Sequence, residues 1–344
     1  MFRSFSRSIS IFVKESSGEV PWRRGPEAVQ DVLVCLGPNC DKSANALRTA
    51  CELAARTAGT TQVRAIHVPK SRDWRNDPKV ADLLHTAAPV SVDILEGGSS
   101  VKKSIVKQIE SKIPDLCVIG AESRSGPLSI LSTVQYVTRY APCDMLVVRD
   151  EGLSSLTSGE SMKALVCFGI SDWEGSIDAF KATLRIARPG DVIEAVHVVH
   201  AGGVVDAVFG PPMIVPQGNG TTEDKILKAL EKAMLEALDD KSTCLSRSEV
   251  KISPKVLFAG ADNPVRTLTD YAERCQANVL SVGVGSIGRI LNPVNFSYHL
   301  TRKSPCSVLV ARKTEHCIQN THTSNVVGFY VEDPQQWVQT KSFI

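Results

Sequence analysis

Two glycine-rich segments contain the residue types that could hold a phosphate group. They run from Cys117 to Thr133, as CVIGAESRSGPLSILST, and from Ser281 to Ser297, as SVGVGSIGRILNPVNFS. In each segment an apolar run ends at a glycine, whose expected positive φ brings backbone N–H groups close to an anion at the start of the next helix. Serine and threonine hydroxyls there could donate hydrogen bonds to phosphate oxygens. The candidate residues are Gly120, Ser123, Gly126, Ser132 and Thr133 in the first segment and Gly283, Gly285, Ser286, Gly288, Asn295 and Ser297 in the second.

Two other loops compete for the same role. They follow the first strand expected in each half of the chain, at Gly37-Pro38-Asn39 and at Gly169-Ile170-Ser171. In an open parallel sheet, ligands bind beyond the carboxyl ends of the strands where the strand order reverses. Val68 and Val198, which end the second expected strands, complete the candidate set. The alternative is that these loops only turn a strand into a helix, which requires glycine and a small capping residue whether or not a ligand binds.

No set of residues in the sequence forms a convincing catalytic site. The segment around Ser286 is similar to the G-x-S-x-G nucleophile turn, but Val284 occupies the position of its first glycine. His67 and His197 occur at the same place in both halves and could act as an acid or base. A strand histidine with a satisfied hydrogen bond is the simpler interpretation. We therefore expect no enzymatic activity and no metal site.

The chain contains two copies of one unit. DVLVCLG returns as KALVCFG, RAIHV returns as EAVHV, and TRYAPCDMLVVR returns as TRKSPCSVLVAR. Gly120 and Gly283 are 163 residues apart, as are Cys143 and Cys306, so nothing is inserted between these pairs. The first two pairs of segments have offsets near 130, which places an insertion of about 33 residues after Val198 of the second copy.

Each copy alternates strands and helices. Continuous apolar runs such as VLVCL and MLVV are typical of central parallel strands covered by helices on both faces. Apolar residues at helical spacing follow the first strand of each copy, and Asp41 or Ser43 could cap the first of these helices. The insertion contains a loop and an amphipathic helix, TTEDKILKALEKAMLEALDD. The pattern predicts an α/β protein with two tandem, doubly wound, Rossmann-like domains.

The domain boundaries follow from the repeat and from local composition. We predict domains at residues 28–150 and 162–313, joined by the small, polar segment 151–161, which is typical of a flexible linker. Residues 1–27 form an N-terminal extension, and residues 314–344 form a C-terminal tail. The first fourteen residues contain no acid and place arginine and lysine opposite a phenylalanine-rich stripe. That composition indicates an organelle-import presequence, with a disordered tail as the alternative.

Composition and charge limit the partners and the compartment. The net charge of the 344-residue chain is +2 with both signs interleaved, which argues against a dedicated nucleic-acid surface. No apolar run approaches the length of a membrane-spanning helix. Ten cysteines are spread singly, without a C-x-x-C pair. We expect a reducing intracellular compartment, which is the cytoplasm or, with a presequence, the mitochondrion or plastid.

Both copies resemble the universal stress protein family. The resemblance rests on the strand–glycine loop–helix pattern followed by QYVTRYAPCDMLVV in the first copy and, more loosely, by SYHLTRKSPCSVLV in the second. It covers about residues 30–150 and 162–313. It implies a five-stranded, mainly parallel sheet in each copy and pairing through the last strands as an internal pseudo-dimer. Some members of the family bind ATP through G-x-x-G-x9-G-[ST], with an aspartate that ends the first strand.

This sequence departs from the ATP-binding pattern at several positions. The aspartate is replaced by Gly37 and Gly169, the second glycine of the motif is Ser123 or Ser286, and the final glycine–hydroxyl pair is missing. The resemblance implies a non-enzymatic stress-response or signalling protein that binds an adenine nucleotide such as ATP in the glycine-richer second copy. One alternative is an interaction or scaffold protein with vestigial pockets, which recruits protein partners but no nucleic acid or membrane. A slow nucleotide hydrolase is a further alternative.

Overall fold

The computed structural model describes most of the two repeated units. The described residues are 29–37, 40–56, 61–68, 78, 90–95, 100–121, 133–149, 160–169, 173–199, 222–239, 250–259, 263–284 and 296–312. All of them belong to one compact unit, Met1–Lys313. The expected presequence, most of the expected linker and the tail 314–344 lie outside the described residues.

The described strands and helices occur in the same order in both halves of the chain, except that α7 (Thr222–Asp239) of the second half has no described counterpart in the first. The first half contains β1 (Asp31–Leu36), α1 (Cys40–Arg56), β2 (Gln62–His67), β3 (Ser91–Ile94), α3 (Val101–Ser111), β4 (Leu116–Gly120), α4 (Thr133–Tyr140) and β5 (Asp144–Val148). The second half contains β6 (Lys163–Phe168), α5 (Trp173–Ile186), β7 (Val192–Val199), α7 (Thr222–Asp239), β8 (Lys251–Phe258), α8 (Pro264–Arg274), β9 (Val279–Gly283), α10 (Phe296–Lys303) and β10 (Ser307–Ala311). The amphipathic helix predicted in the insertion is α7.

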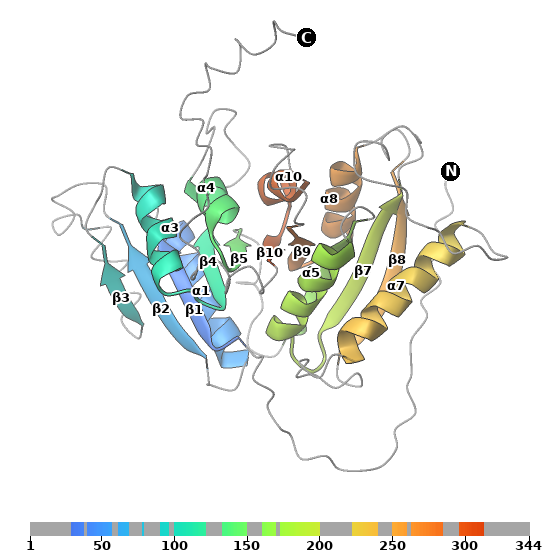
Figure 1. Cartoon of the computed structure of the whole chain (residues 1–344), viewed down its shortest axis with the longest axis horizontal. Helices are drawn as coiled ribbons and strands as arrows, with labels where there is room; N and C mark the ends of the chain where they lie inside the picture. The colour runs from blue at the N-terminus through green and yellow to red at the C-terminus, as the bar shows by residue number, and fades with distance from the viewer. Residues whose placement is uncertain are drawn as a thin grey trace, which may run out of the picture. The chain divides into compact units, whose positions relative to one another are not determined.

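The strands form one ten-stranded sheet in the order β3-β2-β1-β4-β5-β10-β9-β6-β7-β8 (Figure 1). Within each half all neighbouring strands are parallel. The halves meet at an antiparallel pair, in which Val147, Leu146 and Met145 of β5 face Val308, Leu309 and Val310 of β10. The predicted α/β class, with mostly parallel strands and flanking helices, is confirmed, and the two five-stranded sheets are joined edge to edge.

Helices cover both faces of the sheet because most strands are apolar on both faces. Helices α1, α5 and α7 pack on one face, where alternate strand residues such as Val34 and Val166 are buried with Phe180 and Leu230. Helices α3, α4, α8 and α10 pack on the other face, against residues such as Leu33 and Leu280. No helix in the described part of the chain is both long enough and apolar enough to cross a membrane.

Candidate functional site

The strand order reverses once in each half, between β1 and β4 and between β6 and β9. The carboxyl ends of these parallel strands therefore define one candidate crevice per half. The fold brings eight predicted site residues to these ends or to the helices that begin beside them. They are Gly37, Val68, Gly120 and Thr133 in the first half and Gly169, Val198, Gly283 and Ser297 in the second.

The other predicted site residues cannot be placed. Ser123, Gly126 and Ser132 of the first glycine-rich segment lie outside the described residues, as do Gly285, Ser286, Gly288 and Asn295 of the second and Asn39 and Ser171 of the first-strand loops.

The glycines that end β4 and β9 are required by helix packing. A Cβ atom on Gly120 would lie 2.3 Å from the backbone oxygen of Lys42, and one on Gly283 would lie 1.8 Å from the backbone oxygen of Gly175. Real Cβ atoms do not approach other atoms this closely, so only glycine allows the first turns of α1 and α5 to lie against the strand ends. The expectation of a positive φ at Gly120 and Gly283 is wrong, because Gly190 is the only glycine with a positive φ among the described residues.

A buried serine fixes the loop after the first strand in each half. Ser43 accepts a hydrogen bond from the Gly37 N–H at 2.8 Å and donates one to the Gly37 carbonyl at 3.0 Å. Ser176 accepts the equivalent bond from the Gly169 N–H at 2.9 Å. The sequence predicted Ser43 only as a helix cap, and Ser176 was missed. A serine six or seven residues after the glycine in both copies was the available signal.

The two halves differ in the space beside these first loops. A Cβ atom on Gly37 would be 3.9 Å from the Ser43 hydroxyl, whereas one on Gly169 would meet no atom of the described residues within 4 Å. Val68 is buried and Val198 is partly buried at the ends of neighbouring strands. Thr133 begins α4 and is partly buried, and Ser297 is buried in the first turn of α10.

The repeated histidines are buried strand residues. The Nδ1 atom of His67 lies 3.1 Å from the Leu36 carbonyl, and Nδ1 of His197 lies 2.8 Å from the Phe168 carbonyl. Both rings therefore tie the second strand of their half to the end of the first strand. Their side chains are 2% and 3% exposed, which leaves them poorly placed to exchange protons with a substrate. The simpler interpretation of these histidines agrees with the structure.

Polar residues also line a hollow at the amino-terminal ends of β6 and β9, opposite the candidate crevice of the second half. This hollow of about 770 Å³ is lined by Lys163 and Cys275 among others. Lys163 lies 3.2 Å from Glu194, which accepts a hydrogen bond of 2.6 Å from the Tyr271 hydroxyl. Burial raises the pKa of the Cys275 thiol although Lys163 acts in the opposite direction. A thiol that stays protonated is a weak nucleophile.

The repeated order of strands and the glycine loops can now be compared with known proteins. Residues 29–149 match the model of the Universal stress protein family. The first half of this chain is a universal stress protein domain. The tandem form of the family fits the whole chain, because the second half repeats the strand order of that domain. No curated protein matches the sequence.

Two solved structures share the fold of this chain. A putative universal stress protein from Pseudomonas aeruginosa UCBPP-PA14 is 13% identical, with 85% of this chain and 96% of that chain covered and a TM-score of 0.51. A functionally unknown protein from Pseudomonas aeruginosa PAO1 gives the same four values. A universal stress protein from Archaeoglobus fulgidus DSM 4304 is also 13% identical, with 81% and 98% covered and a TM-score of 0.47. The first two likenesses support the fold alone.

Proposed function

We propose that this tandem universal stress protein is a non-enzymatic stress-response or signalling module whose second half binds an adenine nucleotide. The proposal rests on the family, some of whose members bind ATP, and on the position of the candidate residues. In the second half Gly169, Val198, Gly283 and Ser297 lie at the strand ends or the adjoining helix where the strand order reverses. Ligands of open parallel sheets bind at such points.

The open space beside Gly169 is the observation that carries the assignment to the second half. A ring or phosphate could approach the backbone there, since no atom of the described residues lies within 4 Å of the place that a Cβ atom on Gly169 would take. A Cβ atom on Gly37 would instead lie 3.9 Å from the Ser43 hydroxyl, within van der Waals contact. The segment after Gly283 contains two further glycines, Gly285 and Gly288, whereas the segment after Gly120 contains only Gly126. Glycines let backbone N–H groups come close to a phosphate.

The burial and bonding of the repeated histidines and of the Cys275 thiol support the non-enzymatic part of the proposal. The two repeated histidines bond to strand carbonyls inside the protein, and burial raises the pKa of the Cys275 thiol. Under this proposal a nucleotide bound here acts as a signal and is released unchanged.

A second candidate function is an interaction scaffold with vestigial pockets. It is favoured by the replacement of the family's aspartate by Gly37 and Gly169 and by the serine bonds that occupy the N–H groups of both glycines. Under this alternative the chain would bind protein partners and no nucleotide. A slow nucleotide hydrolase is the third candidate, and release of phosphate from ATP by the purified chain would support it.

A matched pair of variants tests the leading proposal. Calorimetric titration of the full chain with ATP, ADP, AMP and cyclic AMP is expected to show binding of at least one of them. Gly169→Val fills the open space and is expected to weaken that binding at least about tenfold, which corresponds to about 1.4 kcal/mol. Gly37→Val is the control and is expected to bind like the wild type. No binding at millimolar nucleotide, or equal loss in both variants, would contradict the proposal.

A further inference from the structure

The junction of the two halves is built around reciprocal arginines. Arg149, at the end of β5, donates a hydrogen bond to the carbonyl of Thr301 in the last turn of α10. Arg312, directly after β10, donates to the carbonyls of Thr138 and Arg139 at the end of α4. Because Arg149 and Arg312 are equivalent in the repeat, as are Thr138 and Thr301, each half caps a helix of the other in the same way.

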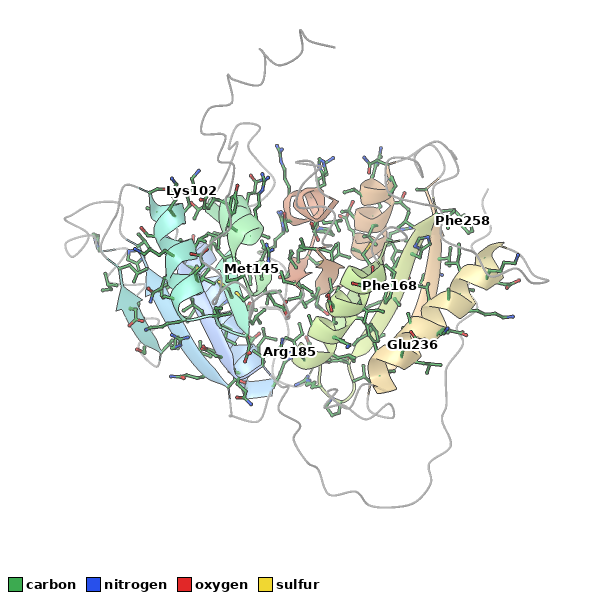
Figure 2. The ribbon with its side chains drawn as sticks, in the orientation of Figure 1. Lys102, Met145, Phe168, Arg185, Glu236 and Phe258 are labelled. Atoms are coloured by element: carbon green, nitrogen blue, oxygen red, sulfur yellow. The ribbon has the colours of Figure 1, made fainter. Side chains whose placement is uncertain are left out.

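The charges at the junction break this symmetry. Arg185 of α5, labelled in Figure 2, carries the cation at this junction. Its guanidinium lies 3.5 Å from Asp144 and 3.4 Å from Asp115, both in the first half. Asp144 also accepts a hydrogen bond of 2.8 Å from the Arg312 N–H. A cation of the second half therefore meets two carboxylates of the first.

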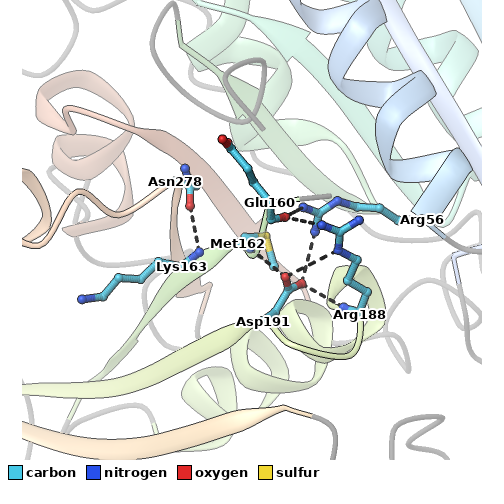
Figure 3. Close-up of polar contacts among 7 residues, drawn as sticks. All are labelled: Arg56, Glu160, Met162, Lys163, Arg188, Asp191 and Asn278. Carbon is cyan, nitrogen blue, oxygen red and sulfur yellow. Dashed lines mark hydrogen bonds and ion pairs between the residues drawn. The ribbon is translucent and has the colours of Figure 1, made fainter. Parts of the chain in front are cut away.

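A second ion pair also crosses the junction (Figure 3). Arg56, at the end of α1, lies 3.1 Å from Asp191, which precedes β7. The two side chains are 7% and 0% exposed. Asp191 also accepts hydrogen bonds from the backbone N–H groups of Met162 and Arg188, at 2.6 and 2.9 Å. Burial lowers the pKa of Arg56 although Asp191 acts in the opposite direction, so desolvation of this pair is costly.

Equivalent positions in the two copies show which residues would meet at the junction if two first halves, or two second halves, paired with each other. Ser43 and Ser176 make the same bond to the first-strand glycine, so α1 and α5 align with an offset of 133 residues. Glu52 then occupies in α1 the position that Arg185 occupies in α5. Two first halves would place Glu52 against Asp144 and Asp115, so three carboxylates would meet.

A pair of two second halves would lose the attraction between Arg185 and the two carboxylates. Asn278 is equivalent to Asp115, since each accepts a hydrogen bond from the backbone at the start of the first strand of its half. Ser307 is equivalent to Asp144, since it accepts from the Arg149 N–H at 3.4 Å as Asp144 does from Arg312. Arg185 would then face two neutral side chains in place of two carboxylates.

We infer that the junction selects unlike halves through charge, with Arg185 opposite Asp144 and Asp115 and Arg56 opposite Asp191. The surface formed by β5, α1 and their polar neighbours is thus a docking surface for the second half of this chain and discriminates against a second copy of the first half. The apolar residues of the two strands cannot supply this choice, because β5 (DMLVV) and β10 (SVLVA) present similar aliphatic side chains to each other.

The energetic role of these pairs is specificity more than stability. Burial raises the pKa of Asp144 to about 6 although Arg312 and Arg185 oppose the shift, so desolvation outweighs the attraction. Buried ion pairs of this kind are close to neutral for stability, but like charges in their place cost several kcal/mol. Pairing of unlike halves is therefore favoured mainly because the like pairs are penalised.

The experiment uses the full chain with a protease site placed in the segment 151–159. The purified protein is cut, unfolded in urea, returned to native buffer at pH 7.5 and analysed by native mass spectrometry. We expect complexes of one first half with one second half to exceed like pairs at least about tenfold. A random mixture of like and unlike pairs, or separate halves, would overturn the inference.

Charge variants give the second readout. Arg185→Glu is expected to reduce the excess of unlike pairs at least about tenfold. Asp144→Asn with Asp115→Asn, made in the wild-type chain, is also expected to reduce the excess, because Glu52 of a like first half would then meet no carboxylate. Arg266→Gln is the matched control, because Arg266 is an exposed arginine of α8 that pairs with Asp270. An unchanged distribution in Arg185→Glu would overturn the inference.

For variants that refold poorly, a double-mutant cycle of Arg185→Gln and Asp144→Asn in the uncut chain serves instead. The free energies of unfolding are measured in urea, and a coupling energy of zero between the two residues would overturn the inference.

Discussion

At the scale of single residues, equivalent-looking glycines have different roles. Gly283→Ala is expected to lower the free energy of unfolding by about 2 kcal/mol or more, because the new Cβ would overlap the backbone of Gly175 at 1.8 Å. Gly169→Ala is expected to change it by less than about 0.5 kcal/mol, because nothing described lies near. Urea unfolding of both variants is the measurement. Equal effects would contradict the assignment of Gly283 to packing.

Asp144 predicts a pH dependence of stability. Its pKa in the folded protein is raised from 3.8 to about 6, chiefly by burial, with a smaller contribution of the same sign from Asp178 and opposing ones from Arg312 and Arg185. Between about pH 4 and pH 6 the folded state therefore binds more protons than the unfolded state. Its contribution to stability falls as the pH rises through this window, by at most about 3 kcal/mol.

Asp144→Asn removes the titrating group and tests that dependence. Unfolding free energies measured by urea at pH 4, 5, 6 and 7 should show a difference between wild type and variant that shifts in favour of the variant with rising pH. A difference that stays constant across these pH values would show that Asp144 does not titrate in this window.

The glycine pattern of the candidate site could be predicted from the sequence, but the reason for the glycines could not. The repeat and the family resemblance located Gly120 and Gly283 at strand ends, where they are found. The approach of the Lys42 and Gly175 backbones depends on how α1 and α5 pack across the sheet. That contact joins segments about 80 to 110 residues apart, and no local pattern reports it.

At the scale of elements, the junction depends on arginines that cap helices of the opposite half. Arg149→Ala is expected to lower the free energy of unfolding by about 1.5–3 kcal/mol, since it removes a charge-assisted hydrogen bond to the Thr301 carbonyl from a buried position. The same variant should increase the rate of backbone amide hydrogen exchange in α10. Lys303→Ala, an exposed change in the last turn of the same helix, is the control and should leave both nearly unchanged.

The elements themselves followed from local patterns. Apolar runs predicted the central strands, and helical spacing predicted α1, α5 and α7. Asn263 accepts a hydrogen bond from the Val265 N–H at 2.8 Å, and an asparagine directly before a proline is a common sequence pattern at a helix start such as that of α8. The joining of β5 to β10 could be expected only from the family resemblance, because the edge of an apolar strand looks the same in sequence whichever strand it meets. The charges that accompany this pair became visible only with the fold.

At the scale of the whole molecule, duplication has given one sheet with two halves that are no longer alike. A Cβ atom on Gly37 would contact the Ser43 hydroxyl, whereas one on Gly169 would have no atom of the described residues within 4 Å. At the junction Arg185 of the second half meets Asp144 and Asp115 of the first, and Arg56 of the first half meets Asp191 of the second. Under the proposed function the second half receives a nucleotide and the first half does not.

Native mass spectrometry of the gently purified full-length chain tests this account most directly. The account predicts one bound adenine nucleotide per chain, either carried through purification or acquired with added ATP, and identified unchanged after denaturing release. A mass without nucleotide at millimolar ATP would contradict nucleotide sensing and favour the scaffold. Two nucleotides per chain would contradict its restriction to the second half, and released ADP formed from ATP would contradict a non-enzymatic protein.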